Sequence, residues 1–471
     1  MKKQNTFDVI VIGSGAAGFS AVEAAVQQGA SVCLIEKSRL GGECPNDACV
    51  PSKALLKSAA VYRQIARSKE YGIEASVRSL DWTSVMKYRD QVVKTVTGGG
   101  DIGDRYLEIL KTLNVSHRIG TATFVDDQTI EVGEERLTAK GFVLATGTTD
   151  FIPPITGIEE IPYWGWREAL RATKQPKSMA IIGAGPVGCE IATLYASFGT
   201  RVVLVQTLPF VLDREDVEIS RRAAEALRHI GVDVVTEAKI TELVNGRVGV
   251  IGVKVMTPGQ VEQMFAVERV VIATGKRANV QELGLDTAGV DLDTHGNIKT
   301  NAKQRTSAPH IFSAGDVDGG LMFTHTAHHE GWIAGGNAAL FAKKKQKLLS
   351  ANEHVVPRVT FIDPEVASVG ATEAEVRKLY GKVLMGQYEI LQLGRAVTDH
   401  AQSGLIKLVA HPKTRKLLGA HLICPHAGEL IHEAALVISL NATIDTIANM
   451  IHAYPTYAEG MKAAASVAVV S

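Results

Sequence analysis

The chain has 471 residues, 46% of them hydrophobic and 21% charged, and its 50 Lys and Arg side chains balance 50 Asp and Glu. This length predicts two to four domains, and the composition excludes disordered and fibrous proteins. The balanced charge indicates no nucleic-acid or anionic membrane partner, and no apolar run approaches the roughly 20 residues that span a bilayer.

Cysteine usage and the N-terminus predict a cellular location. Five cysteines in so long a chain do not form a disulfide scaffold. Two lysines precede the first apolar stretch, but glycines interrupt it after about six residues and no export cleavage pattern follows. We therefore expect a reduced, cytoplasmic protein.

A dinucleotide-binding fingerprint lies near the N-terminus. Residues 7–12, FDVIVI, predict a buried strand that leads into Gly13, Gly15 and Gly18, an alanine-rich helix, and a second strand ending at Glu36. In this pattern the three glycines permit a tight turn, close approach of a pyrophosphate, and packing of helix on strand. The helix N-terminus stabilises phosphate charge, and Glu36 is placed to accept hydrogen bonds from a ribose.

Two of the five cysteines, Cys44 and Cys49, lie in the segment GGECPNDACVPSK. Such a pair can be a zinc half-site, a structural disulfide or a working redox pair, and a reduced location argues against the structural disulfide. The following residues predict a helix that opens near Pro51. A thiol beside a helix N-terminus has a lowered pKa, and Lys53 falls in the same first turn.

A second fingerprint follows about 170 residues later. SMAII leads into Gly183, Gly185 and Gly188, a helix, and the strand RVVLV, with Gln206 at the position of the ribose carboxylate. Glutamine can bind a 2′-hydroxyl without repelling a 2′-phosphate, so this unit accepts NADPH as well as NADH.

Three further segments end apolar strands. Two are ATG sequences that end at Gly147 and Gly275, and the third is IFSAGD, which places Asp316 just after a strand. We expect the two glycines at cofactor sites and Asp316 near sugar-like hydroxyls.

The motifs GSGAAG, GGECPNDACVPSK, ATG, GAGPVGCE, ATGKRAN, IFSAGD and HAYPTYAE, in this order, resemble the pyridine nucleotide-disulfide oxidoreductases. This family includes lipoamide dehydrogenase, glutathione reductase and mercuric reductase, and the resemblance covers essentially the whole chain. It implies an α/β homodimer with two Rossmann-like dinucleotide-binding domains and a C-terminal α+β dimerisation domain. The implied divisions are FAD binding in residues 1–150 and 276–345, NAD(P)H binding in 151–275, and dimerisation in 346–471.

The resemblance also implies a path for two electrons, from NAD(P)H to FAD and then to a Cys44–Cys49 disulfide. Cys49 is the implied thiol nearest the flavin, and Cys44 is the interchange thiol that faces the acceptor. Glu36 and Asp316 are implied at the adenosine ribose and the ribitol of FAD. We predict no metal site, because zinc needs about four ligands and no second pair at ligand spacing occurs.

The resemblance further implies that Lys53 pairs with Glu190 close to the reactive part of the flavin. A cation there would stabilise negative charge on the reduced ring. The other cysteines lie singly in apolar or helical segments and are expected to be inert.

The C-terminal motif departs from the disulfide-reducing members of the family, which carry a His-Pro-Thr motif with a glutamate five residues after the histidine. Here Tyr454 replaces that histidine and Glu459 keeps the offset. Their ordinary pKa values differ by about 3.5 units, or roughly 4.8 kcal/mol, so a phenol is a poor base at neutral pH. His452 is expected to be a local hydrogen-bonding residue, and the Tyr454–Pro455 bond is a candidate for the cis form.

The tyrosine and the surrounding helices resemble mercuric reductase. This resemblance fits the chemistry of the tyrosine, because a soft cation that binds thiolates directly depends less on a base. Two departures are the SVAVVS terminus, where a vicinal cysteine pair is usual, and the lack of an N-terminal metal-binding module. A third and smaller departure is Ala48, which stands before the second cysteine where many relatives have glycine. We predict an FAD-dependent NAD(P)H oxidoreductase acting on a small or thiol-bound acceptor. The alternatives are a lipoamide dehydrogenase, a reductase of quinones or other small oxidants, and a redox sensor without turnover.

Overall fold

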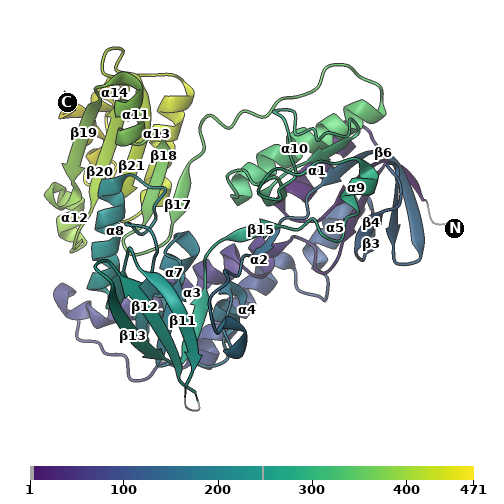
Figure 1. Cartoon of the computed structure of the whole chain (residues 1–471). Helices are drawn as coiled ribbons and strands as arrows, with labels where there is room; N and C mark the ends of the chain where they lie inside the picture. The colour runs from purple at the N-terminus through teal and green to yellow at the C-terminus, as the bar shows by residue number, and fades with distance from the viewer. Residues whose placement is uncertain (1–4, 247–248) are drawn as a thin grey trace. The chain divides into compact units, whose positions relative to one another are not determined.

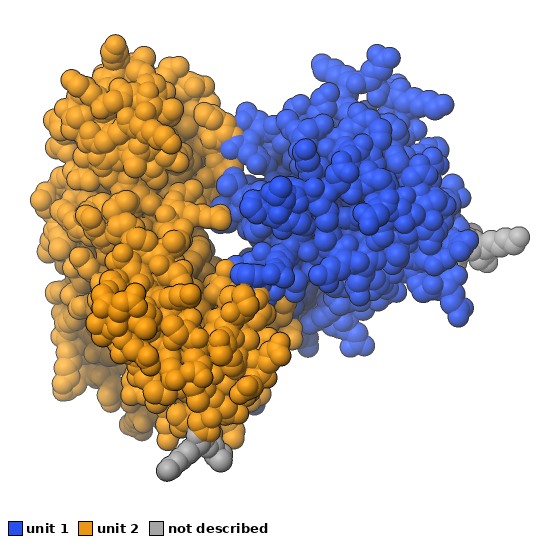
Figure 2. Space-filling view, viewed as in Figure 1, with its two compact units in different colours: residues 1–51, 87–151, 275–353 blue, residues 52–86, 152–274, 354–471 orange. Residues whose placement is uncertain are grey.

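The computed structural model describes residues 5–246 and 249–471. The chain divides into two compact units, of which unit 1 contains residues 1–51, 87–151 and 275–353 and unit 2 contains residues 52–86, 152–274 and 354–471 (Figure 2). No helix in the described ranges is long and apolar enough to cross a bilayer.

Unit 1 is built on a seven-stranded sheet in which β1, β2, β3, β6 and β16 run parallel (Figure 1). The antiparallel strands β4 and β5 extend it beyond β6. The strands are β1 (Thr6–Ile12), β2 (Val32–Glu36), β3 (Ser116–Ile119), β4 (Ala122–Phe124), β5 (Thr129–Val132), β6 (Glu135–Leu144) and β16 (Ile311–Ser313). A separate two-stranded sheet pairs β7 (Thr148–Asp150) with β15 (Lys276–Ala278).

The two faces of this sheet are buried in different ways. In β1, Val9 and Val11 belong to one cluster of buried side chains and Ile10 and Ile12 to another, because successive side chains in a strand point to opposite faces. One cluster contains residues of α1, α5 and α10, and the other contains residues of α9 and of the segments on either side of it, between 283 and 298. The helices whose residues all lie in this unit are α1 (Ala16–Gln27), α2 (Glu43–Asn46), α5 (Asp104–Thr112), α9 (Leu285–Ala288) and α10 (Thr324–Ala342), with the 3₁₀ turn η3 (Asp316–Asp318).

The first part of unit 2 repeats the parallel arrangement on a smaller scale. Its four-stranded sheet has the order β10-β9-β8-β14, and a three-stranded antiparallel sheet follows in the order β11-β12-β13. The strands are β8 (Ser178–Ile182), β9 (Arg201–Val205), β10 (Val232–Val235), β11 (Lys239–Asn245), β12 (Ile251–Thr257), β13 (Val261–Val267) and β14 (Arg269–Ile272). The helices are α6 (Trp166–Arg171), α7 (Pro186–Ser197) and α8 (Val217–His229), with the 3₁₀ turn η2 (Ile158–Glu160).

The last part of unit 2 is a six-stranded antiparallel sheet in the order β17-β18-β21-β20-β19-β22. Its strands are β17 (Arg358–Thr360), β18 (Val366–Gly370), β19 (Leu384–Glu389), β20 (Leu405–Ala410), β21 (Leu417–Ile423) and β22 (Val469–Val470). Helices α11 (Glu373–Tyr380), α12 (Gly394–Thr398), α13 (Ala427–Ser439), α14 (Ile444–Asn449) and α15 (Glu459–Ser466) and the 3₁₀ turn η4 (Ile390–Gln392) complete it.

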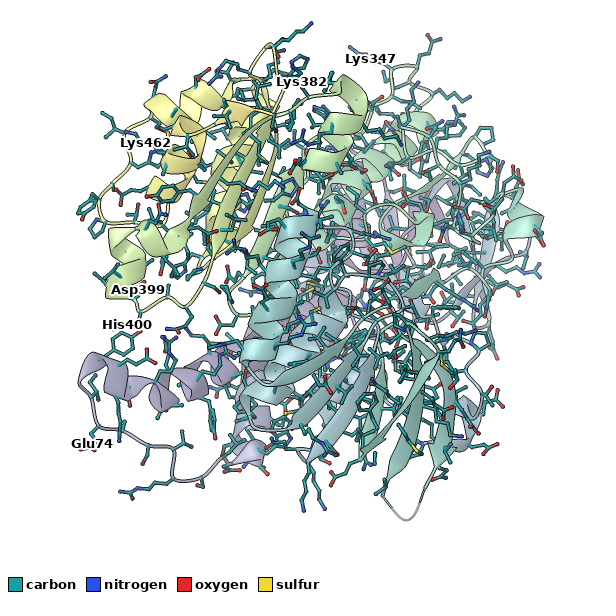
Figure 3. All side chains as sticks on the ribbon, turned by 60° about the vertical axis from the view of Figure 1, so that its left-hand side comes forward. Glu74, Lys347, Lys382, Asp399, His400 and Lys462 are labelled. Atoms are coloured by element: carbon teal, nitrogen blue, oxygen red, sulfur yellow. The ribbon has the colours of Figure 1, made fainter. Side chains whose placement is uncertain are left out.

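Two helices, α3 (Cys49–Ala66) and α4 (Trp82–Thr97), have residues in both units, and the 3₁₀ turn η1 (Ser68–Tyr71) lies between them. The segment after α3 is held by the loop that follows α12, where Asp399 and His400 lie (Figure 3). Arg67 donates a hydrogen bond to the His400 carbonyl at 2.6 Å, and Tyr71 donates one to the Asp399 carbonyl at 2.7 Å. Two α/β sheets with parallel strands and a C-terminal antiparallel sheet with helices confirm the predicted fold class.

Candidate active site

The first glycine fingerprint forms a tight turn between β1 and α1. Gly13 has φ +101°, and a Cβ there would lie 2.1 Å from the Ala145 carbonyl oxygen, so only glycine fits. A Cβ on Gly18 would lie 1.9 Å from the Gly13 carbonyl oxygen, so the helix packs on the turn too closely for any side chain at this position. A Cβ on Gly15 would meet no atom within 4 Å. Space therefore opens at the helix N-terminus, where a pyrophosphate needs it.

The second fingerprint repeats this geometry between β8 and α7. Gly183 has φ +102°, and its Cβ would lie 2.4 Å from the Ala273 carbonyl oxygen. A Cβ on Gly188 would lie 1.9 Å from the Gly183 carbonyl oxygen, and one on Gly185 would meet nothing within 4 Å. The same open position recurs, so the chain has two sites with the shape that a dinucleotide pyrophosphate requires.

The two ATG segments have a packing role that the sequence did not reveal. Their alanines, Ala145 and Ala273, supply the carbonyl oxygens against which the first glycine of each fingerprint is seated. Gly147 and Gly275 have φ +65° and +128°, and a Cβ on either would meet nothing within 4 Å. These two are turn glycines, and their contact with cofactors stays a prediction.

The polar side chains at the two ribose positions have partners within the chain. Glu36 is buried, and it accepts hydrogen bonds from the Ser14 amide at 3.0 Å and the Ser14 hydroxyl at 2.6 Å. Its other oxygen accepts from the Ser38 amide at 2.9 Å. Gln206 accepts from the Thr207 amide at 3.0 Å. A ribose would have to share or replace the hydroxyl contacts of Glu36, since amide donors are fixed by the backbone.

The segment that carries Cys44 lies directly against the first fingerprint. Gly42 has φ +69°, and a Cβ there would lie 2.6 Å from the Gly15 Cα. Asn46 donates to the Gly42 carbonyl at 2.9 Å and closes the short helix α2. Burial raises the pKa of Tyr106, and the nearby Cys44 adds to the rise. Cys44 is half-buried beside the position where the first dinucleotide would lie.

Helix α3 begins at Cys49, two residues before Pro51, where the sequence predicted the opening. Pro51 is tolerated in the first turn because the first amides of a helix have no acceptor within it. Cys49 is therefore the first helical residue, and it is half-buried. Its Sγ lies 3.7 Å from the Thr324 Oγ1, a contact that no sequence motif indicated.

Lys276 is a second residue that the sequence did not identify, although the motif ATGKRAN contains it. Its Nζ lies 3.3 Å from Glu43 Oε2 and 3.7 Å from Asp316 Oδ2. Burial acts against the charged form of Lys276, but Glu43 and Asp316 outweigh it and the pKa of the ammonium is raised. One lysine thus connects the residue before Cys44 with the carboxylate expected at the ribitol.

Lys53 and Glu190 form an ion pair within unit 2. Lys53 Nζ lies 2.7 Å from Glu190 Oε2 and 4.5 Å from the centre of the Phe361 ring. The other Glu190 oxygen accepts a hydrogen bond from the Phe361 amide at 3.1 Å. These contacts fix the direction of the lysine, and its effect on the flavin stays a prediction.

The C-terminal residues separate an exposed phenol from a buried imidazole. The Tyr454–Pro455 bond is cis, and Tyr454 is 79% exposed. Glu459 accepts a hydrogen bond from the Thr456 amide at 3.0 Å. The His452 side chain is only 3% exposed, and its Nε2 lies 3.1 Å from Glu433 Oε1. Burial raises the pKa of Glu433, and His452 offsets part of that rise.

The remaining cysteines are buried, as expected. Burial raises the pKa of Cys33 to about 12, and it raises the pKa of Cys189 and Cys424 well above the usual range. These thiols stay protonated at neutral pH and are poor nucleophiles. In residues 5–246 and 249–471 no group of three or more His, Cys, Asp or Glu side chains is arranged to hold a metal ion.

Comparison with known families matches nearly the whole chain. Residues 7–331 match the family described as pyridine nucleotide-disulphide oxidoreductase, and residues 356–465 match the dimerisation domain of that family.

Individual relatives divide between two activities. A mercuric reductase of Staphylococcus aureus is 32% identical over 98% of this chain and 82% of its own length. A dihydrolipoyl dehydrogenase of Bacillus subtilis is 33% identical over 95% of this chain and 96% of its own, and one of Thermus scotoductus is 34% identical over 98% and 97%. Among solved structures, the HOCl-induced flavoprotein disulfide reductase RclA of Escherichia coli shares the fold, with a TM-score of 0.84, 24% identity, and 98% and 99% coverage.

Proposed function

The chain belongs to the pyridine nucleotide-disulphide oxidoreductases, enzymes that use FAD and NAD(P)H, and from this premise we propose that Cys44 and Cys49 pass electrons to thiol-bound Hg(II). The reaction consumes NAD(P)H and Hg(II) and yields NAD(P)⁺, Hg(0) and one proton, so two electrons leave the nicotinamide and two reach the metal. FAD, when bound, carries those electrons between the nicotinamide and the cysteine pair.

The main site residues have separate proposed tasks. The glycines of the two fingerprints would hold the pyrophosphates of FAD and NAD(P)H, with Glu36, Gln206 and Asp316 at the sugars. Cys49, at the start of α3, would be the thiolate on the flavin side, because the helix N-terminus favours its charged form. Cys44 would bind the acceptor.

The observation that carries the choice of acceptor is the absence of an accessible base at the C-terminal motif. Tyr454 is exposed, but a phenol is a poor general base at neutral pH, and His452 is enclosed by Glu433 and the Met450 carbonyl. Reduction of a disulfide substrate requires proton transfer at the interchange thiol, for which a base titrating near neutral pH is best. A soft metal ion binds thiolates without that transfer.

We further propose that the protein is a homodimer and that Tyr454 and Glu459 complete the site of the partner subunit. The support is the match of residues 356–465 to a dimerisation domain and the exposure of Tyr454. A cytoplasmic location and the predicted domain boundaries stay predictions.

The test is anaerobic NADPH and NADH oxidation by the purified FAD-loaded protein with Hg(II) in excess thiol, with lipoamide, and with a quinone. We expect Hg(II) to support turnover and lipoamide to be slower by 10²-fold or more, in the range that general acid–base catalysis contributes. The variant Cys44→Ser should lose Hg(II) turnover. Quinone turnover that survives this substitution would favour direct reduction by flavin, and failure of NAD(P)H to reduce the flavin would favour a redox sensor.

The second candidate is a dihydrolipoyl dehydrogenase, favoured by the relatives that match at 33% and 34% over nearly their whole length. The variant Tyr454→His separates the two functions. If the phenol limits disulfide chemistry, Tyr454→His gains lipoamide turnover with a pH profile governed by a group near 6.5, and Tyr454→Phe does not. Fast lipoamide turnover by the unaltered protein would contradict the mercury proposal.

A further inference from the structure

The hydroxyl of Thr324 contacts the sulfur of Cys49, although the two residues are 275 positions apart in the chain. Thr324 is the first residue of α10, a helix of 19 residues, and Cys49 is the first residue of α3, a helix of 18 residues. The partial positive charge at both helix N-termini therefore acts on the same sulfur. Such an arrangement favours a thiolate over a thiol.

The Thr324 hydroxyl is available for this contact because another residue closes the first turn of α10. The Phe323 amide donates to the Thr326 hydroxyl at 3.2 Å, and that hydroxyl donates to the Phe323 carbonyl at 2.8 Å. Thr324 has no part in that capping pair, and its hydroxyl lies 3.7 Å from the Cys49 sulfur.

The position of α10 is fixed by close packing against α1, the helix of the first fingerprint. A Cβ on Gly331 would lie 2.1 Å from the Ala17 carbonyl oxygen, and one on Gly335 would lie 2.1 Å from the Ala21 carbonyl oxygen. The two backbones therefore touch, and α10 cannot slide without breaking that contact. The hydroxyl is held at a fixed place relative to the dinucleotide turn.

Only one direction of donation is possible once Cys49 is ionised, because a thiolate has no proton to give. We propose that the Thr324 hydroxyl donates a hydrogen bond to the Cys49 thiolate and is the positioning residue that keeps this sulfur ionised. This inference rests on the proposed redox role of Cys49, and it adds a determinant of its reactivity. In this proposal Thr324 acts through Cys49.

Several other charged or titratable groups lie on the elements that meet at Cys49. They are Lys53 one turn further along α3, Glu43 and Cys44 on α2, and His325 beside Thr324 on α10. These positions are the same in every Thr324 variant compared, so the comparison isolates the hydroxyl.

The experiment measures the pH dependence of Cys49 alkylation by iodoacetamide in the FAD-loaded Cys44→Ser protein. Thr324→Val keeps the shape and removes the hydroxyl, whereas Thr324→Ser keeps the hydroxyl. We expect Thr324→Val to raise the apparent pKa of Cys49 by about one unit, which lowers the thiolate fraction about tenfold below that pKa. Thr324→Ser should stay close to the parent. A Cys49 thiolate next to the oxidised flavin should give a long-wavelength charge-transfer absorbance. The pH at which this absorbance appears should rise in Thr324→Val and stay close to the parent in Thr324→Ser.

Equal apparent pKa values in the parent and Thr324→Val would overturn the proposal, as would equal shifts in the valine and serine variants. If Thr324→Val does not bind FAD, Thr324→Ala provides the same comparison. The alkylation measurement uses no acceptor, so it is independent of the mercury proposal. If Hg(II) is not reduced but Thr324→Val still shifts the pKa, the acceptor assignment fails and the role of Thr324 stands.

Discussion

Glu330 is a buried carboxyl on α10 that supports the turn before Asp316. It is 3% exposed, and its Oε2 accepts a hydrogen bond from the Gly315 amide at 2.6 Å. Burial raises the pKa of Glu330, and the negative charge of Asp318 raises it further. Burial also raises the pKa of Asp318 itself. The protonated form of Glu330 is therefore favoured in the folded protein at pH values where an exposed glutamate is ionised.

This shift predicts that stability falls as the pH rises above the ordinary carboxyl range. Between the unfolded and folded pKa values the folded state binds more protons than the unfolded state, so the free energy of unfolding decreases with pH. Glu330→Gln keeps an acceptor for Gly315 and cannot titrate. We expect the parent to lose on the order of 1–3 kcal/mol more than Glu330→Gln between about pH 5 and pH 8.

The measurement is the melting temperature of the FAD-loaded protein across that pH range. The two curves should diverge with rising pH, the parent falling more steeply. Parallel curves would show that Glu330 has the same protonation state in the folded and unfolded chains.

Two C-terminal residues, Tyr454 and His452, show what the sequence predicts at a single position and what only the structure reveals. The tyrosine in place of a histidine at position 454 is visible in the sequence, and its consequence for basicity follows from side-chain chemistry. The enclosure of His452 by Glu433, 19 residues away, required the packing of α13 against the C-terminal segment. The contact agrees with the expectation of a local hydrogen-bonding residue.

Among the elements, α10 packs its backbone directly against α1, the helix of the first fingerprint. It carries Thr324, Glu330 and the glycines that pack on α1. Its position along α1 therefore sets both the distance from Thr324 to Cys49 and the distance from Glu330 to the Gly315 amide. A helix with small residues at such spacing lets backbones approach, and added methyl groups force them apart.

Gly331→Ala therefore should destabilise the protein, since the new methyl would meet the Ala17 carbonyl oxygen at 2.1 Å. We expect a loss of about 1–3 kcal/mol and a lower melting temperature. Gly336→Ala on the same helix is the matched control, because its Cβ meets only the end of the Leu349 side chain, at 3.0 Å. That control should be neutral or gain up to about 1 kcal/mol from helix propensity. Equal effects of the two substitutions would contradict tight packing of α10 on α1.

At the scale of the whole molecule, exposed apolar side chains near the C-terminus point to a second copy of the chain. Ile451 is 93% exposed, Leu440 69%, Val469 64% and Leu436 61%. These residues fall in or just beyond the range that matches the dimerisation domain. A contiguous patch of exposed apolar side chains marks an interaction site, and we expect these four side chains to contribute to one.

Ile451→Asp should weaken the dimer, because a carboxylate would lose its water on association. We expect a monomer by size-exclusion chromatography with light scattering at micromolar concentration. Hg(II) turnover should fall as well, since the partner would no longer supply Tyr454. Met264→Asp, at an apolar side chain that is 61% exposed on β13 and outside the range that matches the dimerisation domain, should leave the dimer intact. A dimer that survives Ile451→Asp would place the interface elsewhere.

The sequence by itself determined the two nucleotide-binding patterns and the close spacing of the two cysteines, because both are local in the chain, whereas the C-terminal α+β domain was predicted from the family resemblance. Each fingerprint is a strand, a glycine turn and a helix in sequence order, and Cys44 and Cys49 lie five positions apart. The apolar run of each strand and the positive φ of Gly13 and Gly183 are properties of a few consecutive residues. The dinucleotide sites could therefore be predicted before the structure was known.

Only the tertiary structure decided which distant side chains act on those local motifs. Thr324 meets Cys49 from 275 residues away, and Lys276 meets Glu43 from 233 residues away. No periodicity or spacing in the sequence indicates either contact, because each depends on how separate helices and strands pack in three dimensions. The physical reason is that hydrogen bonds and ion pairs act over a few ångströms of space, whatever the separation along the chain.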